Sequence, residues 1–155
     1  MQKTERGGHR PRRSITFERP IASALRIVVL DVATGTTRML PTPPGTWQHG
    51  YAVFSPDSTQ VAYWRTADGS GDDLQLVVAP ADGSSEGRVL GGSVADTWTG
   101  FGWQPVVWAP DGTGIVASTG GDDFGTQWWM PTDGSDARQL GAGASEFVDV
   151  QRLAP

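Results

Sequence analysis

Apolar residues recur in short runs separated by tight turns, not at the spacing of a helix. In VFSPDSTQVAYW (residues 53–64) two apolar segments flank a Ser-Pro-Asp turn, and the pattern returns in VWAPDGTGIVAS (residues 107–118). The runs IVVL, VAYW and WWM do not alternate with polar residues, which indicates strands that are covered on both faces. The pattern, rich in Gly and Pro, predicts an all-β protein of many short strands.

A second landmark follows each of these segments. A turn that ends in glycine leads into an Arg-x-Leu strand in VLDVATGTTRML (29–40), VVAPADGSSEGRVL (77–90) and WMPTDGSDARQL (129–140). Arg38, Arg88 and Arg138 are spaced at intervals of fifty residues. The spacing therefore predicts a repeat whose unit holds four short strands.

Twelve strands are expected from this repeat. We place them at about 13–19, 26–31, 37–40, 51–54, 60–65, 74–79, 88–90, 106–108, 114–118, 127–130, 138–140 and 147–155. The Asp-Gly pairs at 82–83 and 133–134 supply the left-handed backbone that a tight hairpin turn needs.

A four-stranded sheet with two apolar faces must stack against its neighbours. A period of 40 to 55 residues with four strands in each unit is typical of a β-propeller. We expect blade 1 at about 13–40, blade 2 at about 46–90 and blade 3 at about 101–140. Residues 147–155 form a lone strand in this interpretation, and residues 1–12 a disordered basic tail.

The segments FSPDSTQVAYW…LQLVVAPADG…RVL and WAPDGTGIVAS…TQWWMPTDGSDARQL resemble the blades of TolB-like, WD-repeat-like (PD-repeat) β-propellers. The resemblance covers about residues 13–153, with Ser58 where glycine is usual and Ala109 where serine is usual. It implies a non-catalytic scaffold for protein–protein or ligand binding. The alternative is an accessory propeller, or a fragment, of a prolyl-oligopeptidase-like hydrolase whose catalytic domain lies elsewhere.

Three blades are too few for an ordinary closed ring, because propellers typically have four to eight. Two explanations stay open. The chain is a fragment of a longer propeller, or two chains form a homodimer that closes a six-bladed ring, each C-terminal strand completing the first blade of its neighbour.

Composition and charge exclude several classes of protein. The absence of cysteine removes disulfides, thiolate metal sites and a cysteine nucleophile.

Charge is unevenly distributed along the chain. Residues 1–20 carry six Arg or Lys and two Glu, whereas the remaining residues carry six Arg and fifteen Asp or Glu. An acidic body does not suit nucleic acid. No apolar stretch reaches the length of a membrane span or a signal-peptide core, so the chain as written shows no export signal and would be expected in the cytoplasm. The resemblance implies the opposite, because TolB-like proteins generally work outside the cytoplasm, and the compartment stays open.

Acidic and aromatic residues gather in the loops that a propeller places opposite its Pro-Asp turns. Such a face could bind a partner protein, since aromatic side chains dominate binding hot spots. The alternative is solvated turns for the Asp pairs and packing between blades for the aromatic residues. The predicted partner-binding residues are Trp47, His49, Asp72, Asp73, Asp96, Trp98, Phe101, Trp103, Asp122 and Asp123.

The repeated turn residues and arginines are expected to be structural. Asp57, Asp82, Asp111 and Asp133 should accept hydrogen bonds from nearby backbone amides. The arginines of the Arg-x-Leu strands should pair with carboxylates of adjacent strands or lie along the sheet edge.

Signatures of an enzyme are weak. GSSEG (83–87) matches the Gly-x-Ser-x-Gly pattern, but Ser85 falls in a hairpin, whereas a nucleophile elbow joins a strand to a helix. His49 is the one histidine outside the tail. We therefore expect no catalytic residue, no metal site and no cofactor.

Overall fold

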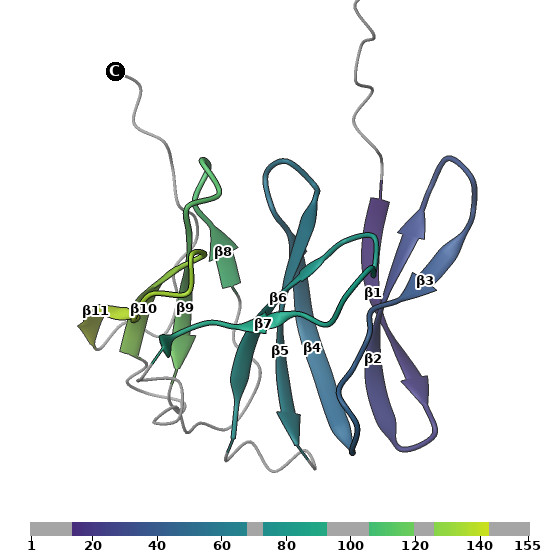
Figure 1. Ribbon diagram of the computed structural model, residues 1–155, viewed down its shortest axis with the longest axis horizontal. Coiled ribbons are helices and arrows are strands. Elements are labelled where there is room, and N and C mark those ends of the chain that lie inside the picture. The colour runs from purple at the N-terminus through teal and green to yellow at the C-terminus, as the bar shows by residue number, and fades with distance from the viewer. Residues whose placement is uncertain (1–13, 68–72, 93–105, 120–125, 143–155) are drawn as a thin grey trace, which may run out of the picture.

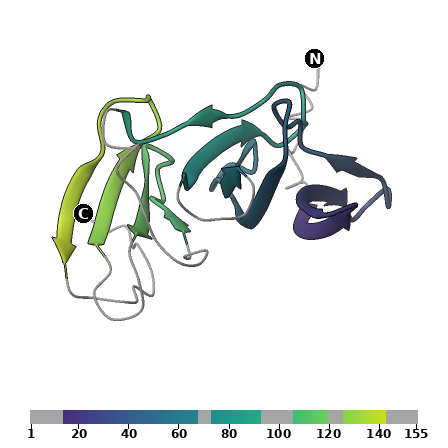
Figure 2. The same ribbon diagram turned by 90° about the horizontal axis from the view of Figure 1, so that it is seen from below.

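The computed structural model describes residues 14–67, 73–92, 106–119 and 126–142. Within these residues the strands form three antiparallel sheets that follow one another along the chain, and no helix occurs among the described elements. The sheets stand side by side, with the first and third at opposite ends (Figure 1). Seen from below, they form a row in which neighbouring sheets turn their faces toward one another (Figure 2).

Each sheet corresponds to one predicted blade, and we keep that name. Blade 1 contains β1 (Ser14–Ile21), β2 (Ala24–Asp31) and β3 (Thr37–Met39) in this spatial order. Blade 2 contains β4 (Trp47–Phe54), β5 (Gln60–Ala67), β6 (Gln75–Pro80) and β7 (Arg88–Val89). Blade 3 contains β8 (Val106–Trp108), β9 (Gly114–Thr119), β10 (Thr126–Pro131) and β11 (Arg138–Ala142).

Strand order within each blade follows the chain, so every strand pairs with its neighbour in sequence. The pairing of Val61 with Phe54 and of Ile115 with Trp108 across the two Pro-Asp turns confirms the repeated hairpin. The segment 147–155 lies outside the described residues.

Of the strands that begin earlier than the pattern predicts, β4 differs most. β4 starts at Trp47 and not at Tyr51, because a bulge between Gly50 and Val53 lets the strand continue past a break in register. Tyr51, inside this bulge, has a left-handed backbone with φ of 52°. A bulge adds a residue on one strand and shifts the alternation of side chains. The sequence pattern therefore did not identify residues 47–50 as part of the strand.

Two apolar clusters join the blades. Ile27 and Val29 of blade 1 pack with Val61, Tyr63 and other buried residues on one face of blade 2. The opposite face of blade 2 packs against blade 3, with a cluster of buried residues that includes Ala62, Trp64, Leu76, Ile115 and Met130. Blade 2 is thus buried on both faces, as its uninterrupted apolar strands predict.

Hydrogen bonds between blades reinforce this packing. Thr16 Oγ1 in β1 donates to the Ala52 carbonyl in β4 at 3.0 Å. Trp108 Nε1 in β8 donates to the Val53 carbonyl at 3.3 Å. Because β4 receives bonds from both neighbouring blades, it is the strand that links all three sheets.

Candidate functional site

Two of the three Arg-x-Leu strands, β3 and β7, lie at the seams between blades. Arg38 of β3 donates from Nε to the Ala81 carbonyl of blade 2 at 2.8 Å. Arg88 of β7 donates from Nη1 to the Asp133 carbonyl of blade 3 at 3.2 Å. Each of these arginines therefore reaches the hairpin turn of the following blade and bonds to a backbone carbonyl there. The sequence had left open pairing with a carboxylate or a position along the sheet edge.

The aspartates of these two turns keep a negative charge beside the arginines. Hydrogen bonds from Ser84 hold the pKa of Asp82 below its usual value, and Arg38 lowers it further. Ser135 acts in the same way on the pKa of Asp133, with a smaller contribution from Arg88. Each turn thus presents a carboxylate and a carbonyl to the guanidinium of the preceding blade.

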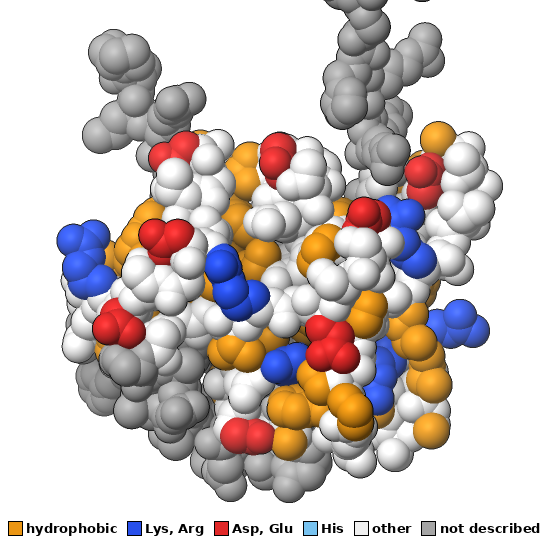
Figure 3. All heavy atoms as spheres, in the orientation of Figure 1, with side chains coloured by type: hydrophobic (Ala, Val, Ile, Leu, Met, Phe, Trp, Pro, Cys, Tyr) orange, Lys and Arg blue, Asp and Glu red, His pale blue; other side chains and the backbone are white. Residues whose placement is uncertain are grey.

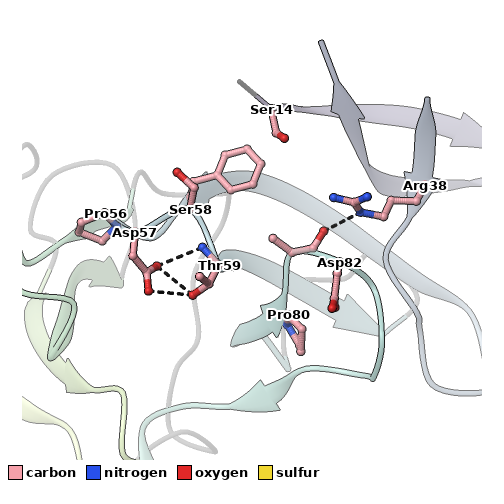
Figure 4. Close-up of a pocket in the computed structure, with 10 residues that line it drawn as sticks. Ser14, Arg38, Pro56, Asp57, Ser58, Thr59, Pro80 and Asp82 are labelled. Atoms are coloured by element: carbon pink, nitrogen blue, oxygen red, sulfur yellow. Dashed lines mark hydrogen bonds between the residues drawn. The ribbon is translucent and has the colours of Figure 1, made fainter. Parts of the chain in front are cut away.

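A pocket of about 430 Å³ opens at the seam between blades 1 and 2, and Figure 4 shows its lining. Its walls include the aromatic ring of Phe54, the guanidinium of Arg38 and the two turns that carry Ser58 and Asp82. The sequence did not point to this pocket. The arginines and the Asp-Gly turns recur with the same spacing of about fifty residues. This shared spacing is the sequence signal from which contact between each arginine and the turn of the next blade could have been predicted.

The rim of the pocket carries a carboxylate that its own turn holds in place. Asp57, on its rim, accepts hydrogen bonds from Ser55 Oγ at 2.6 Å and from the Thr59 amide at 3.0 Å. These bonds lower the pKa of Asp57, so its carboxylate stays ionised and holds the turn. The described lining residues include no histidine.

Asp57 and Asp111 also confirm the structural role predicted for the turn aspartates. Asp111 Oδ1 accepts from the Thr113 amide at 3.0 Å and from its hydroxyl at 2.7 Å, as Asp57 does with Thr59. The four turn aspartates thus stabilise the backbone that follows them.

Trp47 and His49, predicted at the partner-binding loop face, lie within β4. Arg65 stacks over Trp47, with its guanidinium carbon 4.7 Å from the ring centroid. The ring of His49 lies 5.1 Å from that of Tyr63, and both side chains are completely buried. The structure brings these four residues together inside blade 2 and its seam with blade 1.

The buried location makes His49 a neutral residue. The pKa of His49 is lowered from 6.5 to about 4, mainly by burial and in smaller part by the charges of Arg26 and Arg65. Neither His49 ring nitrogen nor the Tyr63 hydroxyl has a hydrogen-bond partner within the described residues. Burial also raises the pKa of Tyr63. His49 therefore carries no charge near neutral pH and is out of reach of solvent in this structure.

Asp73 caps its own loop. Its Oδ1 accepts hydrogen bonds from Thr66 Oγ1 at 2.8 Å and from the Ala67 amide at 3.2 Å. This arrangement fits the alternative interpretation of the Asp pair as a structured turn. The remaining predicted partner-binding residues lie outside the described part of the chain and stay a prediction: Asp72, Asp96, Trp98, Phe101, Trp103, Asp122 and Asp123.

Two other kinds of site were sought in the described ranges. No group of three or more His, Cys, Asp or Glu side chains there could hold a metal ion. Nor does this part of the chain hold a helix with the length and hydropathy of a membrane span.

No protein-family model matches the chain, and no curated protein matches its sequence. Solved structures do match its fold. A protein assigned as TolB from Agrobacterium tumefaciens has a TM-score of 0.64 and 17% identity, covering 88% of this chain and 49% of that chain. TolB from Acinetobacter baumannii has a TM-score of 0.57 and 15% identity, covering 81% of this chain and 31% of that one.

A protein assigned as a dipeptidyl aminopeptidase IV from Bacteroides ovatus is also similar, with a TM-score of 0.56 and 14% identity. That match covers 77% of this chain and 20% of the other. The chain thus spans half or less of each of these proteins, and identities this low establish the fold alone. Its sequential antiparallel blades, packed face to face, have the fold of a TolB-like β-propeller.

Proposed function

We propose that this chain is a non-catalytic propeller module that binds a protein through an uncovered sheet face at the end of its row of blades. The observation that carries this proposal is the face of blade 1 turned away from blade 2. The strand register places Ile15 beside Leu30 and Phe17 beside Val28, and Val28 beside Met39, all on this face. We call it the outer face of blade 1.

Apolar side chains on this outer face remain in contact with solvent. The exposed fractions are 51% for Ile15, 38% for Phe17, 40% for Ile21 and 50% for Met39. Figure 3 shows hydrophobic side chains along the side of the molecule that blade 1 forms. Apolar residues gathered on one sheet face are typical of a surface that another protein covers.

The absence of catalysis is part of the proposal. His49 is buried and neutral, so it is poorly placed to act as a base toward a substrate in solution. Ser85 lies in the exposed turn between β6 and β7, which does not have the strand-to-helix geometry of a nucleophile elbow. These placements favour recognition over reaction.

The alternative is that the chain is the accessory propeller of a hydrolase. The similarity to part of the Bacteroides ovatus protein, assigned as a dipeptidyl aminopeptidase IV, supports it. In that case further blades of a longer chain would cover the outer face of blade 1, and a separate catalytic domain would carry the activity.

The absolute mass of the purified chain, measured by light scattering at several concentrations, tests the proposal. We expect a species heavier than the 16.5 kDa chain. Phe17→Asp should return it to the monomer, because it places a charge within the apolar contact. Ser23→Asp, in the exposed turn between β1 and β2 of the same blade, is the matched control. An oligomeric wild type whose mass is unchanged by Phe17→Asp, or peptidase activity of the purified chain, would contradict the proposal.

A further inference from the structure

The last residue of the Arg-x-Leu motif differs sharply between the blades. Leu40 is 1% exposed and Leu90 is 0% exposed, whereas Leu140 is 48% exposed. Leu40 belongs to the cluster between blades 1 and 2, and Leu90 to the cluster between blades 2 and 3. Position and chemistry are the same in all three copies, so the difference comes from what covers the leucine. In the first two copies the next blade covers it.

The arginine of the motif follows the same rule. Arg38 and Arg88 donate hydrogen bonds to the turn of the next blade. Arg138 pairs with Trp129 along the sheet, on the face turned away from blade 2. No side-chain hydrogen bond from Arg138 to a following turn occurs within the described residues. Blade 3 therefore ends in a complete Arg-x-Leu face with nothing described against it.

Blade 1 presents the other half of this contact. In blades 2 and 3, one strand packs against the preceding blade. This strand is β5 in blade 2, with Val61 and Tyr63, and β9 in blade 3, with Ile115 and Ala117. All four side chains are completely buried. Ile15 and Phe17 occupy the equivalent positions of blade 1 and are 51% and 38% exposed.

The hairpin turns show the same contrast. A side chain at Gly83 would meet Arg38 Cδ at 3.9 Å, and one at Gly134 would meet Arg88 Nη1 at 3.4 Å. A side chain at Gly35, in the corresponding turn of blade 1, would meet nothing within 4 Å. The turn of blade 1 is thus open at the place where the other two turns receive an arginine.

We infer that a second copy of this chain covers these faces, with the Arg138–Leu140 face of each copy docked on the outer face of blade 1 of the other. The inference rests on the proposed function, because it names the partner that the outer face binds. A second copy is favoured because one chain carries both halves of a contact that it already makes twice internally. Two copies then form two identical contacts and close a ring of six blades.

Leu140 should carry most of the affinity. Its equivalents are buried, at 1% and 0% exposure, and burial of an apolar side chain is the main favourable term in such a contact. Arg88 remains exposed within its seam, so the bond made by Arg138 should add less. Leu140→Asp should raise the Kd of the dimer at least about 100-fold, since it also places a charge in the contact. Arg138→Ala should raise the Kd about twofold to tenfold.

A mixing experiment on the full chain tests the inference. A ring of two Leu140→Asp copies would have an aspartate in place of the leucine in both of its contacts. A ring of two Phe17→Asp copies would have a charge on the outer face of blade 1 in both of its contacts. Each variant alone should therefore be a monomer by light scattering. Mixed in equal amounts they should form a heterodimer, because one of the two contacts then has both halves intact. Gln139 pairs with Trp128 and points to the opposite face of β11. The variant Gln139→Asp should therefore stay a dimer.

Each outcome has a defined meaning. Thermal unfolding of every variant shows that it is folded, which the exposure of Leu140 leads us to expect. If Phe17→Asp is a monomer and Leu140→Asp still a dimer, the inference is overturned while the proposed function stands. A wild-type monomer overturns the inference, because the second copy is then not the partner. A wild-type polymer longer than a dimer overturns the closed two-copy ring.

Discussion

Ser58 and Gly112 have the same left-handed backbone at equivalent positions of consecutive Pro-Asp turns, with φ of 61° and 74°. The turn demands this backbone, and serine adopts it at a cost of about 1–2 kcal/mol that glycine avoids. Ser58→Gly should therefore stabilise the fold by about 0.5–1 kcal/mol, after the entropy of the unfolded glycine is counted. Urea unfolding followed by tryptophan fluorescence measures the change.

The reciprocal substitution provides the control. A side chain at Gly112 would meet nothing within 4 Å, so Gly112→Ser changes the backbone preference without a clash. It should destabilise the protein by a similar amount. A Ser58→Gly variant that unfolds at the same or a lower urea concentration than wild type would refute the strain at this turn.

His49 should make stability depend on pH. Its pKa is lowered from 6.5 to about 4 in the folded protein, so between these values the unfolded chain binds a proton that the folded one does not. The contribution of neutral His49 is complete above pH 6.5 and decreases as the pH falls toward 4. The loss should reach roughly 2–3 kcal/mol.

A variant without the buried imidazole isolates this effect. His49→Phe keeps an aromatic ring beside Tyr63 and should flatten the decrease in unfolding free energy between pH 7 and pH 4.5. His9, in the tail, is the same in both proteins. Equal pH profiles for wild type and variant would contradict the assignment to His49.

Two glycines should respond differently to the same substitution. A Cβ at Gly87 would come 2.3 Å from Val77 Cγ1 and 2.8 Å from the Val78 carbonyl oxygen, so the strand would have to move. Gly87→Ala should destabilise blade 2 by about 1–3 kcal/mol. Gly141→Ala, where a Cβ would meet nothing within 4 Å, should change the unfolding free energy by less than about 0.5 kcal/mol. Similar losses in both variants would count against close packing at Gly87.

Thr16 joins blade 1 to blade 2 through its hydroxyl. Thr16→Val keeps the shape and removes the bond to the Ala52 carbonyl, which should destabilise the protein by about 1 kcal/mol. Thr36→Val, an exposed turn residue, should have little effect. Thermal unfolding by circular dichroism compares the two, and an unchanged Thr16→Val midpoint would show that the bond contributes nothing.

Much of the fold follows from local patterns in the sequence. The Pro-Asp turns, the Asp-Gly hairpins and the uninterrupted apolar strands predict the three blades, because each turn chemistry fixes its own backbone and each strand pairs with its neighbour along the chain. The start of β4 could not be predicted in this way. Its bulge around Tyr51 shifts the alternation of side chains, so WQHG reads as a connection.

The candidate sites were harder to predict because they depend on contacts between blades. The sequence places His49 next to polar residues and a glycine, and it does not reveal that Tyr63 and the seam bury it. The spacing of Arg38 and Arg88 was visible, but their partners lie 43 and 45 residues further along the chain. Packing across a seam decides both cases, and a repeat pattern alone does not contain it.

Blade 2 is the one sheet of the three with described neighbours on both faces, and this should set the order in which the protein opens. Local opening of a sheet requires loss of its packing on every covered face. The amides of β5 and β6 should therefore exchange their hydrogens only when the whole molecule unfolds. In the monomeric variants the end sheets, each held on one described face, can open separately and exchange faster, with the middle blade still folded.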